Sequence, residues 1–378
     1  MIEFIDLMEQ YRHLHHDIDS NIQKVLTHGQ YILGPEVKAL EKDLAAYTRA
    51  RHAISCSNGT DALLMPLMAW EVGHGDAVFT TPFTFIATAE VISLLGATPV
   101  FVDIDPDTYN IDVKLLEQTV ERIVSEGKLK PKVILPVDLF GLPADYDEIL
   151  RIARKYDLKV LEDAAQSFGS SYKGKKAGIL GDAAATSFFP AKPLGCYGDG
   201  GAIFTDDDVL AEKLLSIRVH GQGRNKYENV RVGLNGRLDT LQAAILLVKL
   251  KAFDEELEER NRIASKYTVG LEAMLKTPSV PDDLVSSWAQ YSLLAESQEQ
   301  REILRESLKK AGIPTAVYYP VPLHLQQAYQ HLDYKEGDFP VSEDVSRRIF
   351  SLPMHPYLKD GMIEEIIETI RSSLGAKS

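Results

Sequence analysis

The sequence predicts an α/β protein with a mostly parallel central sheet in a large first domain and a smaller α+β domain after it. Three observations support this fold class. The length of 378 residues is enough for two domains. Short apolar segments alternate with helical patterns from residue 52 to residue 218, which is typical of βαβ units. A long helical pattern from about residue 238 then leads into a segment with a different order of elements.

The first helix we expect runs over residues 35–47, with Pro35 in its first turn. Strands are expected at 52–56, 77–80, 99–103, 132–137, 158–162, 184–189 and 201–205. Helices are expected between them at 60–71, 84–95, 112–125, 145–156 and 207–218. Such strands, apolar along their whole length, belong in a sheet that is covered on both faces.

The long helical pattern extends from Leu238 to about Leu275, and its charged middle part, 254–260, is expected to face solvent. Beyond it, strands are expected near 289–296 and 314–319, and helices near 298–311, 341–349 and 360–373. We place the domain boundary near residue 250, with a large domain at 1–250 and a small domain at 251–378.

Composition and charge exclude several classes of protein. The net charge of −14 argues against a general nucleic-acid or membrane-surface binder. Two cysteines, Cys56 and Cys196, provide neither a disulfide framework nor a four-ligand zinc site, so no metal is expected. Residues 1–30 show no apolar signal-peptide core, and no apolar stretch reaches the ~20 residues that span a bilayer. We expect a cytoplasmic protein.

Lys192 and Asp163 form the most informative pair in the chain. A lone lysine is usually a solvated surface charge, but Lys192 follows a Ser-Phe-Phe strand and is flanked by two prolines and a run of glycines. Asp163 ends an earlier apolar strand, where by itself it could simply cap a helix. A pyridoxal phosphate (PLP) enzyme needs a lysine for its Schiff base and a carboxylate that keeps the pyridine nitrogen protonated. Ligands of parallel sheets bind at strand ends, so the pair predicts a PLP site.

A second segment is suited to the phosphate of that cofactor. Residues 57–61 (Ser-Asn-Gly-Thr-Asp) lie between a strand and a helix that begins near Thr60. The amides of Gly59 and Thr60 would then be free at the start of that helix. Helix N-termini bind anions, although a plain helix cap explains the segment equally well. The Ser187 hydroxyl could add a phosphate contact. Neither a Walker loop nor a dinucleotide-binding glycine pattern occurs.

Two further side chains are candidate cofactor contacts. Phe83 follows a strand end and a proline, so its ring could stack on the pyridine, although core packing is the usual role of a phenylalanine. Gln166 lies about one helical turn after Asp163 and could hydrogen-bond the phenolic oxygen of the cofactor. A basic island at 217–237, with five Lys/Arg against one acid, suggests an anionic small molecule or a chance cluster on a surface loop.

These motifs resemble those of a known family. The stretches that carry the resemblance are 162–166 (Glu-Asp-Ala-Ala-Gln), 187–201 (Ser-Phe-x3-Lys-x-Leu-Gly-x2-Gly-x-Gly-Gly) and 233–244 (Gly-Leu-Asn-Gly-Arg-Leu-Asp-Thr-Leu-Gln-Ala-Ala). They are similar to the DegT/DnrJ/StrS nucleotide-sugar aminotransferases over most of the chain. Segments 28–36, 187–205 and 351–357 resemble in particular the UDP-2-acetamido-2-deoxy-ribo-hexuluronate aminotransferases of surface-polysaccharide pathways.

The resemblance implies the type I (aspartate aminotransferase) fold and a homodimer with active sites at the subunit interface. It implies that Asn235 reaches the phosphate of the neighbouring subunit's PLP and that Arg237 approaches the sugar carboxylate. Tyr318 and Tyr319 fall where the family places substrate contacts. The more similar group has His-Tyr-Pro there, and Tyr318 departs from that pattern.

The expected reaction moves the amino group of L-glutamate to a UDP-linked keto-sugar, with 2-oxoglutarate and pyridoxamine phosphate (PMP) formed on the way. The 3-keto group of UDP-2-acetamido-2-deoxy-hexuluronate is the expected acceptor, in surface-polysaccharide or O-antigen biosynthesis. Lys192 would move the proton and Asp163 would stabilise the pyridinium.

Other functions stay open. One is amination of a 4-keto sugar, dTDP- or UDP-linked, and another is an ordinary amino-acid aminotransferase. A PLP- or PMP-dependent sugar dehydratase shares the fold, but histidine replaces the lysine in that subgroup. A non-enzymatic regulator would need a DNA-binding segment, and the sequence shows no basic helix-turn-helix pattern.

Overall fold

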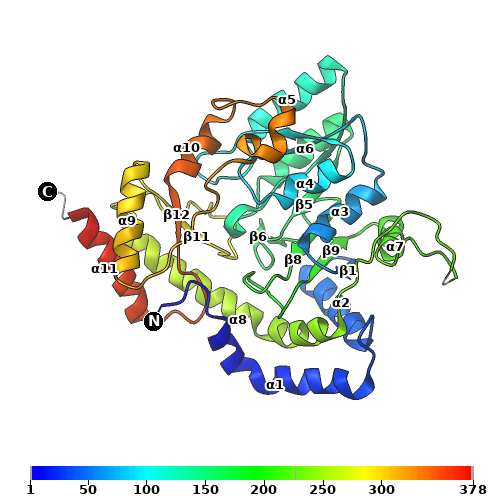
Figure 1. Ribbon diagram of the computed structural model, residues 1–378, viewed down its shortest axis with the longest axis horizontal. Coiled ribbons are helices and arrows are strands. Elements are labelled where there is room, and N and C mark those ends of the chain that lie inside the picture. Colours follow the sequence, from blue (N-terminus) through cyan, green and yellow to red (C-terminus); the bar gives the residue numbers. More distant parts are fainter. Residues whose placement is uncertain (1, 226, 376–378) are drawn as a thin grey trace.

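The computed structural model describes residues 2–225 and 227–375, and its centre is a seven-stranded sheet (Figure 1). The strand order is β1-β9-β8-β5-β4-β2-β3. The bounds are β1 (His52–Cys56), β2 (Asp76–Thr80), β3 (Thr98–Phe101), β4 (Lys130–Ile134), β5 (Lys159–Asp163), β8 (Ala183–Ser187) and β9 (Gly201–Thr205). Strand β9 is antiparallel to β1 and β8, whereas the β5–β8, β4–β5, β2–β4 and β2–β3 pairs are parallel. The predicted, mostly parallel sheet is confirmed.

Helices cover both faces of this sheet. Their bounds are α2 (Pro35–Thr48), α3 (Gly59–Ala69), α4 (Ala87–Leu94), α5 (Val113–Glu126), α6 (Tyr146–Tyr156) and α7 (Asp208–Ile217), close to the predicted ranges. Successive strand residues point to opposite faces, so Ile203 packs in one core cluster with α3, α4 and α7, while Phe204 packs in another with α2. This alternation explains why the strands are apolar throughout.

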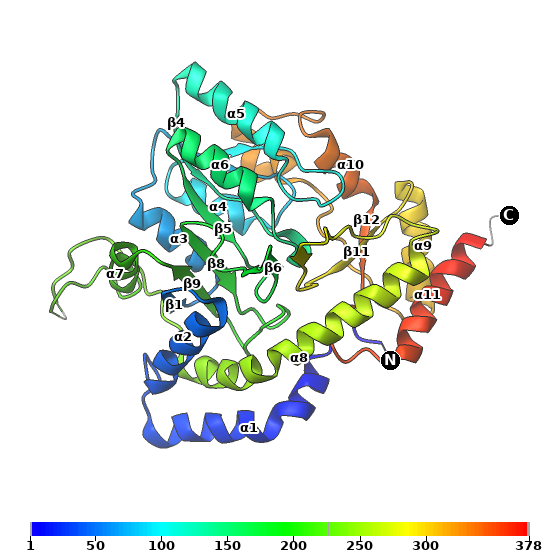
Figure 2. The ribbon, with the colours of Figure 1, turned by 180° about the vertical axis from the view of Figure 1, so that it is seen from behind.

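Two long helices lie side by side below the sheet in Figures 1 and 2. The predicted long helix is α8 (Thr240–Leu271), and α1 (Leu7–His28) packs along it. The sequence analysis did not predict α1, because it buries few side chains (Gln10, Ile18 and Val25) and the rest of it is mostly polar. In the described part of the chain, no helix combines the length and the apolar character needed to cross a membrane.

The C-terminal part packs against the second half of α8. It contains β11 (Tyr291–Leu294), α9 (Gln298–Lys310), α10 (Pro340–Arg348), β12 (Ile349–Leu352) and α11 (Asp360–Gly375). A small sheet of β10 (Leu284–Val285), β6 (Ser171–Tyr172) and β7 (Lys175–Lys176) adjoins it, and the short 3-10 helices are η1 (Leu139–Gly141), η2 (Leu323–Leu325) and η3 (Gln327–Leu332).

The strand predicted near 314–319 is wrong. Pro314 and Pro320 bracket this segment and lack the N–H that a sheet ladder needs, so it forms only one bridge, between Ala316 and Ser351. The partner of β11 is instead β12, whose apolar residues directly follow α10. The predicted domain boundary at residue 250 falls inside α8. Ile2 packs in the C-terminal core cluster, and the division into 1–250 and 251–378 stays a prediction.

Phe168→Ala should destabilise the fold by about 3–5 kcal/mol, because it removes a large buried ring. Phe168 is 2% exposed and stacks on Tyr47, Phe204 and Phe253 at centroid distances of 5.3, 5.9 and 5.5 Å. The measurement is the free energy of unfolding from denaturant titration followed by circular dichroism. Val124→Ala on the exposed side of α5 is the control, with a change below about 0.5 kcal/mol. Equal effects of the two substitutions would contradict this account.

Candidate active site

Asp163 lies at the carboxyl end of β5, and two hydrogen-bond donors hold its carboxylate. It is 4% exposed and accepts hydrogen bonds from Thr88 Oγ1 at 2.9 Å and from the Ala165 amide at 3.2 Å. The Thr84 hydroxyl contacts that of Thr88 at 3.0 Å, which extends the chain of hydroxyls. Burial raises the pKa of Asp163, and the hydrogen bonds from Thr88 and Ala165 together with the charge of Lys192 oppose that rise. Two hydrogen bonds therefore fix the carboxylate, and it can still accept others.

Lys192 lies in the loop between β8 and β9, half-buried and within electrostatic reach of Asp163. Its backbone N–H donates to the Phe189 carbonyl at 2.8 Å, so the loop folds back on itself directly before the lysine. Burial lowers the pKa of Lys192, and the negative charge of Asp163 opposes this shift. The structure therefore brings together the two residues that the sequence analysis paired.

The segment before α3 forms a cradle against the end of β8. A Cβ added at Gly59 would lie 2.7 Å from Ser187 Cβ, so only glycine allows this approach. Gly59 and Thr60 stand in the first turn of α3, where amides have no partner within the helix. The Asp61 carboxylate at the same turn is occupied by Ser57 and Asn58. First-turn amides without a partner in the helix, beside a serine hydroxyl, fit the phosphate of a PLP group.

Gln166 is fixed by both ends of its carboxamide. Its Oε1 accepts from the Phe140 amide at 2.6 Å, and its Nε2 donates to the Tyr319 hydroxyl at 3.0 Å. Burial raises the pKa of Tyr319, and Gln166 opposes that shift. Tyr318 is half-buried beside Phe4, with ring centroids 6.3 Å apart. The predicted contacts Gln166 and Tyr319 therefore lie in one hydrogen-bonded group, with Tyr318 next to it.

The structure does not favour Phe83 as the ring that stacks on a ligand. Phe83 is 0% exposed and meets Tyr109, Phe140 and Tyr319 edge-on, so its ring packs in the core, and its stacking on a cofactor stays a prediction. Two residues on, Phe85 is 56% exposed at the entrance to α4, with its ring 6.5 Å from that of Tyr319. The sequence alone could not tell which ring of the Phe-Thr-Phe triplet points inward, and the exposed ring of Phe85 is the better placed of the two to meet a ligand.

The segment with Asn235 and Arg237 returns from a long loop after α7, which projects from the side of the molecule in Figure 1. The Gly236 carbonyl accepts the Ser57 amide at 3.2 Å, so this segment lies next to the cradle of its own chain. The Asn235 side chain is exposed. Of the basic island, Arg218 is buried in an ion pair with Glu41 and has a structural role, and Lys226 lies outside the described residues.

Sequence reasoning missed three polar residues around Asp163. Thr88 binds its carboxylate, and the only available signal was a pair of threonines four residues apart at a helix start. Asp138 is fully buried and accepts hydrogen bonds from Ser167 and Tyr146 at 2.8 and 3.0 Å. Burial raises the pKa of Asp138 to about 7. Glu162 is also fully buried, and burial together with the charge of Asp138 raises its pKa, while the Gly178 and Leu180 amides oppose that rise.

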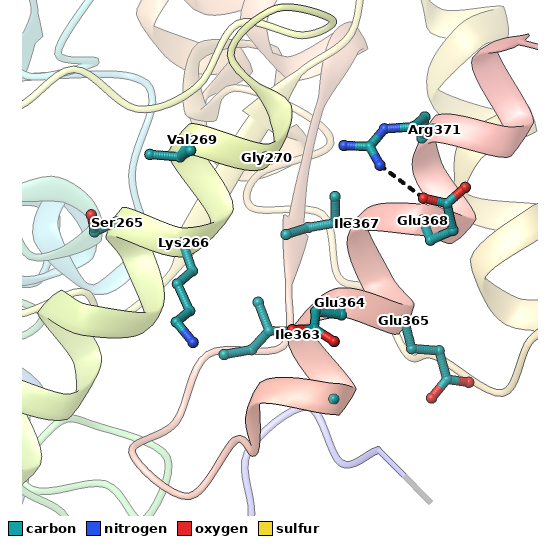
Figure 3. Close-up of a pocket in the computed structure, with 11 residues that line it drawn as sticks. Ser265, Lys266, Val269, Gly270, Ile363, Glu364, Glu365, Ile367, Glu368 and Arg371 are labelled. Atoms are coloured by element: carbon teal, nitrogen blue, oxygen red, sulfur yellow. Dashed lines mark hydrogen bonds and ion pairs between the residues drawn. The ribbon is translucent and has the colours of Figure 1, made fainter.

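A large surface groove lies away from this chemistry. It has a volume of about 810 Å³ and runs between α8 and α11 (Figure 3). Its walls combine apolar residues such as Val269 and Ile367 with glutamates of α11. It contains none of the candidate site residues.

The chain matches the model of the DegT/DnrJ/EryC1/StrS aminotransferase family over residues 12–371. The chain belongs to this family. It is 51% identical over 367 residues to the UDP-2-acetamido-2-deoxy-3-oxo-D-glucuronate aminotransferase of Pseudomonas aeruginosa, which covers 97% of this chain and 98% of the relative. The resemblance inferred from the Lys192 motif is confirmed.

Solved structures agree with the family assignment. A crystal structure of a DegT DnrJ EryC1 StrS aminotransferase from Brucella abortus has a TM-score of 0.96 at 50% identity, covering 99% of this chain and 100% of that one. The structure of NtdA from Bacillus subtilis, with bound cofactor PMP, has a TM-score of 0.87 at 29% identity, covering 98% of this chain and 83% of that one. The protein is an aminotransferase with the type I fold, and its cofactor is pyridoxal phosphate.

The lowered pKa of Lys192 predicts the pH dependence of its reactivity in the cofactor-free protein. Only a neutral amine is acylated, and a lower pKa gives a larger neutral fraction at any given alkaline pH. Half-maximal labelling should therefore occur below the ordinary lysine value of about 10.4, measured against an unstructured lysine peptide by mass spectrometry. Asp163→Asn removes the opposing charge, so the midpoint should fall further. A midpoint at or above that of the peptide would contradict the burial argument.

Gly59→Ala should weaken cofactor binding by about tenfold or more, because the new methyl group displaces the cradle from Ser187. Titration of the cofactor-free protein with pyridoxal phosphate, followed by visible absorption, measures this change. Gly73→Ala is the matched control, since its nearest neighbour would be 3.7 Å from the added Cβ. Unchanged affinity in the Gly59 variant would show that the cradle does not hold the phosphate.

Proposed function

We propose that this enzyme transfers the amino group of L-glutamate to the 3-keto group of UDP-2-acetamido-2-deoxy-hexuluronate. The observation that carries the proposal is the Lys192–Asp163 pair, in a chain 51% identical to an enzyme named for that sugar class. The reaction would serve surface-polysaccharide or O-antigen biosynthesis. Two buried free cysteines, Cys56 and Cys196, suit a cytoplasmic location.

Lys192 is the residue we assign to covalent attachment and proton transfer. Pyridoxal phosphate, when bound, supplies an aldehyde carbon for that attachment and a ring that takes up the electron pair left at Cα of the donor. Whenever it is not attached to the cofactor, the Lys192 Nζ would be available as a base. Its lowered pKa favours the neutral amine, which would take the proton from Cα of the donor and pass it to the cofactor. In the second half-reaction it would move a proton in the opposite direction.

Asp163 acts as a fixed negative charge for the protonated ring nitrogen. The Thr88 hydroxyl and the Ala165 amide hold its carboxylate in place without neutralising it. Gly59, Thr60 and Ser187 would bind the phosphate from one side. Phe85, the exposed ring near Tyr319, takes the stacking role that the sequence analysis gave to Phe83.

A homodimer would complete the site from its open side. Ile32, Phe189 and Val232 are 48, 52 and 84% exposed, and apolar side chains of this kind gain from burial against a second chain. We propose that Asn235 of one subunit contacts the phosphate bound by the other. Arg237 would contact the sugar carboxylate, and its Nε is buried without a hydrogen-bond partner in the described residues. Tyr318 and Tyr319 would contact the substrate.

The second candidate function is amination of a 4-keto sugar, linked to UDP or dTDP. It uses the same Lys192 and Asp163 and differs only in how the sugar lies. A sugar dehydratase of this fold is less consistent with the chain, because Lys192 occupies the position where that subgroup has histidine.

A half-reaction assay separates these candidates. The protein is loaded with glutamate, and UDP- and dTDP-linked 3-keto and 4-keto sugars are then tested for return of the visible absorption of the protein-bound cofactor. The 3-keto UDP-hexuluronate should restore the band fastest, by about tenfold or more over the 4-keto sugars. Lys192→Ala should lose turnover and covalent trapping of the cofactor by borohydride. Preference for a 4-keto sugar would transfer the assignment to the second candidate.

A further inference from the structure

Two side chains of α8 hold the loop that carries Lys192. Gln242 and Lys249 are seven residues, or about two helical turns, apart, so both project from one face of the helix. Both contact the segment 195–198, which begins three residues after Lys192. We call this pair the α8 clamp. Neither residue is needed for the chemistry described above.

Lys249 is an unusual buried charge. It is 1% exposed, its Nζ donates to the Gly195 carbonyl at 2.7 Å, and it lies 4.1 Å from the centroid of the Tyr197 ring. No salt bridge joins it to a carboxylate of the described residues, and the nearby acid Glu256 accepts hydrogen bonds from Gln10 and Tyr357. Burial lowers the pKa of Lys249 to about 8, and Glu256 and the Cys196 thiol oppose the shift.

Gln242 binds the next residue of the loop through both ends of its side chain. Its Oε1 accepts from the Tyr197 amide at 2.9 Å, and its Nε2 donates to the Tyr197 carbonyl at 3.3 Å. Gly198 fits closely over it, because a Cβ there would lie 2.9 Å from Gln242 Nε2. The backbone of Tyr197 is thereby fixed to α8.

The loop transmits this constraint to Lys192 because it is tightly folded. A Cβ at Gly195 would lie 2.4 Å from the Pro190 carbonyl oxygen, so the two sides of the loop touch across Lys192. The Cys196 amide donates to the Phe188 carbonyl at 2.8 Å, which closes the loop at its base. A shift of Gly195 therefore shifts the backbone on either side of Lys192.

We propose that Gln242 and Lys249 are positioning residues that hold Lys192 in place for proton transfer by fixing the segment 195–198 to α8. The proposal rests on the assignment of Lys192 under the proposed function. Burying the Lys249 ammonium costs desolvation free energy, and its hydrogen bond to a loop carbonyl offsets only part of that cost. We infer that the lysine stands in this place because it orders the loop. A displacement of the reacting amine by about 1 Å can slow a reaction by about 10²-fold.

The test uses Lys249→Met, which fills a similar volume without the charge or the donor, and Gln242→Leu. Lys251→Met, an exposed lysine two residues further along the same helix, is the matched control. Both clamp variants should fold with wild-type circular dichroism. Their kcat should fall by about 10- to 100-fold with KM changed less than about threefold, and the isotope effect with α-deuterated glutamate should rise. The control should stay within about twofold of wild type.

Two further readouts do not depend on turnover. In the cofactor-free protein, hydrogen–deuterium exchange of the peptide 188–200 should be faster in both clamp variants than in the control. With pyridoxal phosphate bound, the pH at which the visible band changes should shift, because it reports the surroundings of the Lys192 nitrogen. In a variant that keeps wild-type circular dichroism, a change in either quantity reports a change at the Lys192 loop and not loss of the fold.

Lys192→Ala, measured in parallel, distinguishes failure of the Lys192 assignment from failure of the clamp proposal. If that variant keeps covalent trapping of the cofactor, the assignment of Lys192 is wrong. If it loses trapping while both clamp variants keep wild-type kcat and exchange, the clamp proposal is overturned and the assignment of Lys192 stands. If Lys249→Met does not fold, Gln242→Leu, whose side chain is only partly buried, decides the outcome by the same criteria.

Discussion

The site depends on keeping one carboxylate charged in a buried place at the end of β5. Burial raises the pKa of Asp163, and only a few groups counter this: the Thr88 hydroxyl, the Ala165 amide and the charge of Lys192. Because a buried charge is costly unless it is hydrogen-bonded, the fold has to deliver those donors from α4 and from the chain just after β5. The parallel strands converge at this edge of the sheet, and that convergence makes the arrangement possible.

The lysine poses the opposite requirement. Under the proposed function, Lys192 would both bind the cofactor covalently and move a proton, which needs free motion at the end of the side chain and a fixed backbone at its base. The loop between β8 and β9 meets both needs. Its backbone is closed by the Phe188–Cys196 hydrogen bond and held by α8, whereas the side chain of Lys192 is half-buried beside Asp163. The glycines at 195, 198, 200 and 201 permit the close contacts that fix this loop.

Much of the fold and the central pair could be predicted from the sequence, since β-strand runs, helix patterns and the Lys192 motif are local signals. The features that the sequence could not predict depend on tertiary contacts. Which ring of Phe83 and Phe85 points inward depends on Tyr109 and Phe140, which come from other loops. The pairing of β11 with β12 rather than with 314–319 depends on a contact across more than 50 residues. The hydrogen bonds of Thr88 to Asp163 and of Lys249 to Gly195 depend on how α4 and α8 pack, and no short sequence motif predicts that packing.

The open side of the site is consistent with chemistry shared between two chains. The described chain places Asp163, Lys192 and the cradle at one edge of the sheet. The surface groove of about 810 Å³ lies elsewhere, between α8 and α11. Under the proposed function a nucleotide-sugar has to reach this edge, and a second chain packed over it would help to exclude water from the reacting centre. Exposed apolar side chains such as Phe189 at the same edge gain from burial against a second surface. Assembly and catalysis would then depend on the same surface, so a substitution there should change both together.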